Sequence, residues 1–369
     1  MEGLVINFLP YSFKDIYRGK RVLVTGDTGF KGSWLSLWLH DMGADVVGYA
    51  LPPERDEDHY NVIGLDKIIH HVDGDIRDFP ALQKVFNDFQ PEYLFHLAAQ
   101  AIVKSSYEEP KLTFDTNVGG SVNILEAVRT TPSLRSVIYV TSDKCYRNNE
   151  WIWGYRENDE LGGHDPYSAS KAAAEIVFSA YMDSFFNERE GFGAASVRAG
   201  NVVGGGDWAL DRIVPDCIKA LQSSQPIMVR NPVSTRPWQH VLEPLSGYLL
   251  LASEICRNPV KYSGAWNFGP RGESIRTVQD LAERVVGFWG SGEIQVNVKT
   301  GAPHEAKLLH LNCDKAYQIL GWHPSWNFDC AVDETTYWYK EVISGKPALQ
   351  ISRQQIKKYM ETSYKTKDV

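Results

Sequence analysis

The chain has 369 residues, of which 43% are hydrophobic. At about 150 residues per domain, this length predicts two compact units that bury their cores without disulfide or metal staples. A formal net charge of −8 excludes a general attraction to nucleic acid or to an anionic membrane. The five cysteines form no CxxC pair and no Cys/His cluster, so we expect no metal site.

An apolar run near the start, Leu4 to Leu9, ends at Pro10. It is shorter than the core of a signal peptide and much shorter than the roughly 20 residues of a membrane span. Scattered cysteines without obvious partners indicate a reducing compartment. We therefore expect a cytoplasmic protein without a membrane partner.

Strand and helix patterns alternate from Arg21 onward. Short apolar or β-branched runs occupy 22–24, 46–50, 68–72, 93–97, 137–141 and 195–198. Helical spacing of apolar residues separates them, for example over 34–39 and 118–128. Because parallel neighbours need crossover connections, this alternation predicts an α/β fold of Rossmann type, a doubly wound parallel sheet with helices on both faces.

The pattern becomes irregular after Gly200, with three glycines at 204–206 and several prolines before a helical stretch over 241–256. We therefore predict a second, smaller mixed α/β domain. The expected boundaries are 1–18 for an N-terminal arm, 19–200 for the Rossmann domain with a return segment at about 236–260, 201–350 for the smaller domain, and 351–369 for a C-terminal tail.

The turn after the first predicted strand reads Thr25-Gly26-Asp27-Thr28-Gly29-Phe30-Lys31-Gly32 and leads directly into a helix. Glycines at intervals of three let backbone N–H groups approach a pyrophosphate, and the helix N-terminus adds a partial positive charge. An ordinary strand-to-helix turn can have a similar sequence, but the position of this turn in the first βαβ unit favours binding of a dinucleotide. We assign cofactor binding to Gly26, Thr28, Gly29, Phe30 and Gly32.

The identity of the dinucleotide stays open between NAD and NADP. At the end of the second strand, where an acid usually binds the adenosine ribose, the chain reads Gly48-Tyr49-Ala50-Leu51, and the first acid is Glu54. Lys31 and Arg55 are candidates for a 2′-phosphate. Asp75, which follows the third strand, is a candidate for the adenine.

The run Tyr167-Ser168-Ala169-Ser170-Lys171 opens a predicted helix. Since i and i+4 share a helix face, Lys171 is expected below Tyr167, where its charge lowers the pKa of the phenol from a reference near 10. The string YxxxK is common by chance, but Ser142 precedes it at the end of the fifth strand, and nucleotides bind at such strand ends. We expect Tyr167 to remove a proton from an alcohol that Ser142 orients while a nicotinamide takes the hydride.

Six motifs in this order make the chain resemble a known family. They are TGDTGFKG, HLAAQ, TNVGGSVNILEA, TSDKCY, YSASK and VRAGNVVGGGDW. Together they are similar to the extended short-chain dehydrogenases that act on nucleotide sugars, over residues 19 to about 321. Within that family the chain is most similar to the CDP-glucose 4,6-dehydratases. This narrower similarity lies in the segment GFKGSWLSLWL, the Asp143-Lys144 pair and the segment TRPWQHVLEPL.

The resemblance implies a lyase that uses NAD. C4 of the sugar is oxidised, water is lost across C5 and C6, and the hydride returns to C6. From CDP-D-glucose the product is CDP-4-keto-6-deoxy-D-glucose, a precursor of deoxysugars in lipopolysaccharide O-antigen. By position, Ser142, Tyr167 and Lys171 match the residues of the oxidation, and Asp143 matches the acid that protonates the departing C6 hydroxyl.

Lys144 stands where most relatives carry the glutamate that takes the C5 proton. A lysine with the reference pKa of about 10.4 is protonated at neutral pH and is no base. Either burial or nearby cations make Lys144 basic, or it stabilises the enolate as a cation while another group moves the proton. We expect Asp143 and Lys144 both to act directly, with the division of roles open.

The resemblance also implies further contacts. Cofactor contacts are implied for Asp75, Ile76, Leu97, Ala98, Ala99, Thr116, Tyr167 and Lys171. Substrate contacts are implied for Gln100, Asn117, Asn201, Arg212 and Arg236. A diphosphate in an acidic protein needs positioned donors, arginine first, although a surface ion pair is the alternative for each arginine. The chain lacks a late phosphate arginine that many relatives carry, and Lys307 or Glu305 is expected to contact the ribose or phosphate instead.

Three alternatives accompany this interpretation. A 4-epimerase would need Tyr167 and Lys171 but has no use for an acid at Asp143. A cofactor-sensing protein without catalysis would tend to have lost the Tyr–Lys pair. The third alternative is a substrate with another nucleotide in place of CDP, because the choice of nucleotide leaves little trace in one sequence.

Apolar faces on helices 118–128 and 167–185 are expected to form the family's homodimer, or a dimer of dimers, unless the chain itself covers them.

Overall fold

Among residues 16–296 and 308–365, which the computed structural model describes, seven parallel strands form a central sheet in the order β11-β6-β5-β4-β1-β2-β3. They are β1 (Arg21–Thr25), β2 (Asp45–Ala50), β3 (His70–Asp73), β4 (Tyr93–His96), β5 (Ser136–Val140), β6 (Gly193–Arg198) and β11 (Gly264–Asn267). The strand order reverses between β1 and β4, the switch point at which such sheets bind nucleotides. The predicted doubly wound fold is confirmed.

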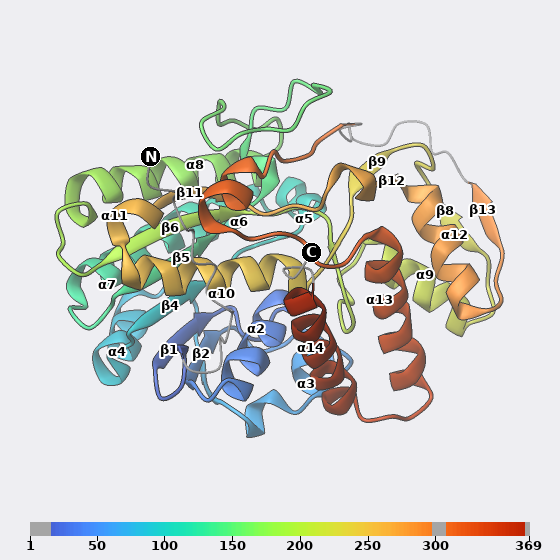
Figure 1. Ribbon diagram of the computed structural model, residues 1–369, viewed down its shortest axis with the longest axis horizontal. Helices are drawn as coiled ribbons and strands as arrows, with labels where there is room; N and C mark the ends of the chain where they lie inside the picture. The colour runs from blue at the N-terminus through green and yellow to red at the C-terminus, as the bar shows by residue number, and fades with distance from the viewer. Residues whose placement is uncertain (1–15, 297–307, 366–369) are drawn as a thin grey trace, which may run out of the picture.

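Helices cover both faces of the sheet because successive side chains of a strand point to opposite sides. Val22 and Val24 of β1 are buried on one face, and Leu23 is buried on the other. The first face carries α2 (Phe30–Asp41) and α10 (Leu242–Arg257), and the second carries α4 (Phe79–Phe89), α7 (Gly120–Thr130) and α8 (Pro166–Tyr181). Figure 1 shows α10 lying across the sheet.

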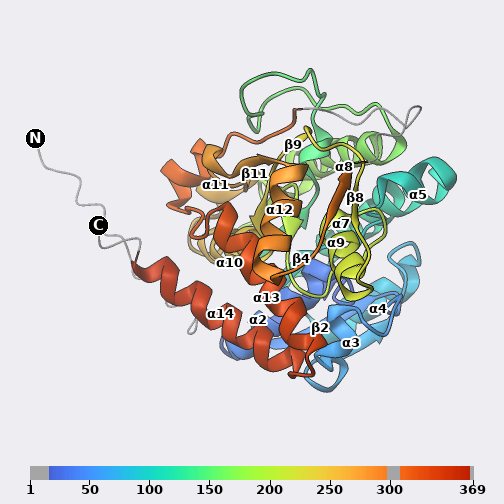
Figure 2. The ribbon, with the colours of Figure 1, turned by 90° about the vertical axis from the view of Figure 1, so that its right-hand side faces the viewer.

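A smaller mixed α/β unit follows β6, as predicted. Its elements are β7 (Val202–Val203), α9 (Ile213–Gln222), β8 (Ile227–Val229), β9 (Thr235–Pro237), β10 (Gln239–His240), β12 (Ile275–Thr277), α12 (Val278–Trp289), β13 (Ile294–Val296) and α13 (Phe328–Ile343). The strands pair in twos, β10 with β7, β12 with β9 and β13 with β8. Figure 1 shows α9, α12, β8 and β13 to the right of the sheet, and in Figure 2 this unit faces the viewer.

Short helical segments connect these elements. They are α3 (His59–Val62), η1 (Leu65–Lys67), α5 (Val103–Glu108), α6 (Pro110–Phe114), η2 (Asp115–Gly119), η3 (Asp143–Cys145), η4 (Met182–Phe186), α11 (Pro259–Tyr262), η5 (Gly272–Ser274) and η6 (Ala316–Leu320). In the described part of the chain, no helix has the length and apolar character that a membrane crossing requires.

The return to the central sheet extends further than the predicted segment at about 236–260. After α10, the strand β11 adds to the sheet beside β6, with Trp266 opposite Val197. The strand reads GAWN and has no β-branched residue, so it lacks the pattern that identified the other strands.

The C-terminal segment also differs from the expected tail. Residues Ala348–Lys365 form the helix α14, in which Ile351, Ile356 and Tyr359 are buried. The hydroxyl of Tyr359 donates to Glu243 of α10 at 2.7 Å, which ties α14 to the helix on the sheet. The polar residues of this segment belong to the exposed side of an amphipathic helix.

Candidate active site at the carboxyl ends of the strands

The glycine turn between β1 and α2 approaches neighbouring backbone too closely for side chains. Gly26 has a φ of +79°, and a Cβ there would lie 2.6 Å from the backbone nitrogen of Ala98. A Cβ on Gly32 would lie 1.9 Å from the carbonyl oxygen of Gly26. Gly29 is the N-cap of α2, and no side chain of the described residues caps this helix end. The turn therefore presents the positive end of a helix dipole without a side-chain cap, which fits a pyrophosphate.

Asp27 anchors this turn to the sheet, a contact that the sequence analysis missed. Its carboxylate accepts a hydrogen bond from Nδ1 of His71 in β3 at 2.7 Å. A Cβ on Gly48 would lie 2.1 Å from the same carboxylate, so the glycine of β2 makes room for it. Burial lowers the pKa of His71, but the hydrogen bond and charge of Asp27 outweigh it and raise that pKa. The sequence feature that indicates this contact is a glycine in β2, Gly48, which pairs with a histidine in β3, His71.

The residues predicted for the adenine lie beside β3. Asp75 forms an ion pair with Arg77, whose Nε lies 2.9 and 3.0 Å from its two carboxylate oxygens, and this partner lowers the pKa of Asp75. Ile76 is buried, and a Cβ on Gly120 would lie 2.6 Å from its Cδ1. Contact of Asp75 with an adenine and of Ile76 with the cofactor stays a prediction.

Neither residue proposed for a 2′-phosphate is placed as that role requires. Burial, together with the charges of Arg212 and Lys171, lowers the pKa of Lys31 to about 8, and the nearby carboxylates of Asp143 and Asp207 oppose that shift. Lys31 therefore lies at the catalytic end of the site and not at the adenosine end. The guanidinium of Arg55 lies 3.2 Å from the carboxylate of Glu54 and is already in an ion pair.

Ser142, Tyr167 and Lys171 come together after β5. Tyr167 and Lys171 lie one turn apart on α8, whose N-terminus is capped by the carboxylate of Asp165 accepting from the backbone N–H of Ser168 at 2.9 Å. The hydroxyl of Ser142 lies close enough to that of Tyr167 to lower the pKa of the phenol. All three side chains are buried. The predicted trio is therefore a single cluster at the carboxyl end of the sheet.

The expected effect of Lys171 on the pKa of Tyr167 is not found. Burial raises the pKa of Tyr167 to about 12, and the hydrogen bond with Ser142 and the charge of Arg212 only partly oppose it. Burial also lowers the pKa of Lys171 to about 8. The prediction that the pKa of the phenol lies below its reference value is wrong for this fold, because desolvation of the phenolate outweighs the nearby charges.

Asp143 and Lys144 belong to the short helical turn η3. The hydroxyl of Ser142 donates to Oδ1 of Asp143 at 3.0 Å and accepts from the backbone N–H of Lys144 at 3.2 Å. Asp143 is 2% exposed, whereas Lys144 is partly exposed. A Cβ on Gly200 would lie 1.9 Å from Oδ2 of Asp143, so this glycine leaves room for the carboxylate.

A buried ion pair lies behind this turn. Arg198 at the end of β6 donates from Nε and Nη2 to the carboxylate of Glu175 on α8, both at 2.8 Å, and the two side chains are each 3% exposed. The carboxylate also accepts from the hydroxyls of Thr141 and Ser196. Burial raises the pKa of Glu175, but Arg198 outweighs it, and the pKa is lowered overall.

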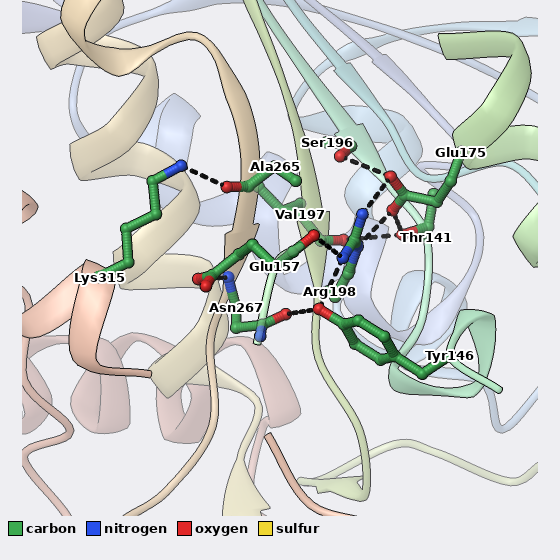
Figure 3. Close-up of polar contacts among 10 residues, drawn as sticks. All are labelled: Thr141, Tyr146, Glu157, Glu175, Ser196, Val197, Arg198, Ala265, Asn267 and Lys315. Atoms are coloured by element: carbon green, nitrogen blue, oxygen red, sulfur yellow. Dashed lines mark hydrogen bonds and ion pairs between the residues drawn. The ribbon is translucent and has the colours of Figure 1, made fainter. Parts of the chain in front are cut away.

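Arg198 continues the network on its other side. Its Nη1 donates to the hydroxyl of Tyr146 at 2.6 Å, and Tyr146 donates to Oδ1 of Asn267 in β11 at 2.8 Å. Figure 3 shows Arg198 between Glu175 on one side and Tyr146 with Asn267 on the other. Thr141 and Tyr146 flank η3, so the network holds both ends of the turn that carries Asp143. The sequence analysis missed it, although Glu175 follows Lys171 at i+4.

Two predicted substrate residues use their side-chain amides within the protein. Asn117 accepts from the backbone N–H of Gln100 at 2.9 Å and donates to Ser170 on α8 at 2.9 Å. The amide of Gln100 donates to the hydroxyl of Thr113 at 3.0 Å. These bonds brace the loop after β4 against α8, and direct contact of either residue with substrate stays a prediction. Leu97, Ala98 and Ala99 lie in that loop, partly buried, and Thr116 lies in η2.

The three remaining candidates lie in the smaller unit. Arg212 forms an ion pair with Asp207 at 2.6 Å, and its charge reaches Tyr167. Arg236 in β9 is 8% exposed and donates to the carbonyl of Thr235 at 2.8 Å. Asn201 has a left-handed φ of +45° beside Gly200. Lys307 and Glu305 lie outside the described residues.

Comparison with known proteins identifies the family. The family model described as GDP-mannose 4,6 dehydratase matches residues 23–335. A CDP-glucose 4,6-dehydratase from Salmonella typhimurium is 48% identical over 354 residues, which cover 95% of this chain and 99% of that protein.

Solved structures show the same fold. A UDP-glucose 4-epimerase from Thermus thermophilus in complex with NAD has a TM-score of 0.74 at 25% identity, covering 87% of this chain and 99% of its own. A dTDP-glucose 4,6-dehydratase from Bacillus anthracis in complex with NAD has a TM-score of 0.73 at 19% identity, covering 90% and 100%. The region matched by the family model contains the glycine turn after β1, η3 and α8. The chain belongs to the GDP-mannose 4,6 dehydratase family of nucleotide-sugar enzymes.

Proposed function

We propose that this protein is an NAD-dependent dehydratase that converts CDP-D-glucose to CDP-4-keto-6-deoxy-D-glucose and water. The observation that carries the proposal is the cluster in which Ser142 contacts both Tyr167 and Asp143, which sets an acid beside an oxidation site. A 4-epimerase has no use for that acid. The Salmonella typhimurium relative, at 48% identity over nearly the whole chain, supports CDP-glucose as the substrate.

NAD is the proposed cofactor. The turn fits a pyrophosphate, since Gly26 and Gly32 leave no space for side chains and α2 begins at Phe30 without a side-chain cap. Lys31 lies at the catalytic end and Arg55 is paired with Glu54, which argues against NADP. When bound, the nicotinamide accepts the hydride from C4 and returns it to C6.

Tyr167 is placed to take the proton of the C4 hydroxyl, with Ser142 orienting the same hydroxyl. Because burial raises the pKa of Tyr167 to about 12, the phenol holds its proton in the unliganded protein. The hydrogen bond with Ser142 and the charge of Arg212 work against that rise. We assign Lys171, on the same face of α8, the role of stabilising the phenolate when the proton moves.

Loss of water is assigned to the turn η3. Asp143 gives a proton to the departing C6 hydroxyl, and Lys144, the next residue, takes the proton from C5 when its side chain is the neutral amine. The 4-keto group makes that C5 proton removable, because the electrons of the C–H bond are delocalised into the carbonyl. Asn201, Arg212 and Arg236 are the proposed contacts of the diphosphate.

A homodimer is the proposed assembly, with dimers of dimers as a further step. Most apolar side chains of α7 are buried within the chain, contrary to the expectation for helix 118–128. Large apolar side chains are exposed on α8 and on α6, which contacts it, namely Ile176 (60%), Leu112 (36%) and Phe114 (39%). A second copy of the chain would cover them around a two-fold axis. Light scattering should give twice the chain mass, and Ile176→Glu should give monomers. A monomeric wild-type protein would contradict this assembly.

We place the enzyme in the cytoplasm and in deoxysugar synthesis for O-antigen. All five cysteines, which lie within the described residues, are free, as expected in a reducing compartment. The proposed product carries the 4-keto-6-deoxy sugar from which such deoxysugars are made.

The test is turnover of a panel of nucleotide sugars. The purified protein is incubated with CDP-glucose, dTDP-glucose, UDP-glucose, GDP-glucose and GDP-mannose, and the 4-keto product is detected by its absorbance in alkali. We expect product from CDP-glucose alone. Product mainly from another nucleotide would overturn the substrate, and a 4-epimer without loss of water would overturn the reaction.

A further inference from the structure

A small cavity of about 50 Å³ lies beside Asp143. Gly200, Gln239 and His310 also line it. The oxidation trio of Ser142, Tyr167 and Lys171, although fully described, contributes nothing to its walls. Asp143 therefore stands between that trio and a separate space that the oxidation chemistry does not use.

Two hydrogen bonds fix the orientation of the Gln239 amide. Gln239 is 1% exposed, and its Nε2 donates to the carbonyl oxygens of Gly200 and Phe268, both at 3.1 Å. The flipped amide would place its oxygen against two carbonyl oxygens, which is unfavourable. Its Oε1 is therefore an acceptor, and this buried atom has no donor among the described residues.

Asp143 presents a second acceptor of the same kind. Its Oδ2 is buried and has no partner within residues 16–296 and 308–365. This oxygen is the one that lies against Gly200, the glycine whose carbonyl Gln239 holds. Asp143 and Gln239 thus both contact Gly200, and all three residues line the cavity. Two buried acceptors without donors are costly unless the cavity holds a molecule that donates two hydrogens.

We infer that this cavity receives the water that leaves C6, and that Gln239 positions it. The inference rests on the proposed function, which makes Asp143 the acid. The C5–H electron pair becomes the C5=C6 double bond, and the neutral amine of Lys144 takes the proton. The C6–O bond breaks with its electron pair on oxygen, which takes the proton of Asp143 and becomes water.

The product water matches the site. Its two hydrogens have two acceptors, the Asp143 carboxylate and Oε1 of Gln239, and the cavity of about 50 Å³ exceeds the roughly 30 Å³ that one water occupies in the liquid. Transfer of the water into the cavity also clears C6 for the returning hydride. Gln239 is thus a positioning residue of the elimination step.

The chain offers a matched control for a Gln239→Met variant. Gln355 on α14 is also buried, donates to the carbonyl of Glu334 at 2.6 Å, and has an Oε1 without a partner in the described chain. We expect Gln239→Met to slow the elimination about 10- to 100-fold with KM for the sugar nucleotide nearly unchanged. Reduced nicotinamide should then accumulate during turnover. Gln355→Met should lower stability only, and equal kinetics of the two variants would overturn the inference.

A double-mutant cycle separates positioning from a general structural role. In an Asp143→Asn background, Gln239→Met should slow elimination by less than about twofold further, because both residues act on the same water. Additive losses would overturn the inference. A high-resolution crystal structure of the unliganded enzyme should show a water within hydrogen-bond distance of Oδ2 of Asp143 and Oε1 of Gln239, and an empty cavity would overturn it.

Failure of this inference is distinguishable from failure of the proposed function. A wild-type protein inactive on every nucleotide hexose overturns the function and with it the role of Gln239. An active wild-type enzyme whose Gln239→Met variant behaves like Gln355→Met overturns only the role of Gln239.

Discussion

The guanidinium of Arg198 and the carboxylate of Glu175 form a two-point ion pair, with both contacts at 2.8 Å and both side chains 3% exposed. The pair joins β6 to α8, the helix that carries Tyr167 and Lys171. It also holds Thr141 and Tyr146, which flank the turn with Asp143. The geometry of oxidation and elimination therefore depends on one buried pair that touches neither reacting group.

Removing one partner of this pair should be strongly destabilising. Arg198→Met leaves the Glu175 carboxylate buried without its counterion, and we expect a loss of about 3–5 kcal/mol in the free energy of unfolding. Urea denaturation measures this loss. The Arg198→Met, Glu175→Met double variant is the control and should recover most of it, because two packed apolar side chains need no counterion. A loss below about 1 kcal/mol in the single variant would contradict the prediction.

Tyr167→Phe should stop the oxidation and spare binding. The variant keeps the ring but loses the hydroxyl that contacts Ser142, and loss of a general base costs about 100- to 10 000-fold. Rapid mixing with CDP-glucose measures the appearance of reduced nicotinamide, and calorimetry measures nucleotide binding, which should change by less than about twofold. A variant that still reduced the cofactor at the wild-type rate would remove Tyr167 from its role.

Asp143→Asn should slow loss of water more than C4 oxidation. Asparagine still accepts from the Ser142 hydroxyl, as Asp143 does at 3.0 Å, but it has no proton to give to the C6 hydroxyl. Reduced nicotinamide should form at close to the normal rate and then persist. If both steps slowed equally, Asp143 would be acting by position and not as an acid.

The sequence predicted the parts of this site that depend on local pattern. The run 93–97 identified β4 (Tyr93–His96) because buried parallel strands are continuous apolar runs. The i, i+4 spacing placed Tyr167 and Lys171 on one helix face, and the strand-end rule placed Ser142 beside them.

Contacts between distant segments were not visible in the sequence. Gln239 and Asp143 are 96 positions apart and meet only because β10 pairs with β7 next to Gly200. The raised pKa of Tyr167 follows from burial by the whole fold, against which a helical neighbour at i+4 is a small effect. Local patterns specify elements and faces, whereas burial and long-range hydrogen bonds depend on the assembled fold.

The buried ammonium of Lys171 should make stability depend on alkaline pH. Burial lowers its pKa from 10.5 to about 8, so the unfolded chain binds more protons than the native protein between about pH 8 and 10.5. The contribution of this residue to the free energy of unfolding should therefore rise with pH across that window and stay constant below it. Lys171→Met removes the cost of burying the charge, so the variant should be more stable than wild type at pH 7, by about 3 to 3.5 kcal/mol from the size of the shift. Urea unfolding at a series of pH values, with Lys84→Met on the exposed face of α4 as the control, should show the difference between variant and wild type shrinking between pH 8 and 10.5. A difference that did not change with pH would show that the ammonium keeps its full charge in the native protein throughout this window.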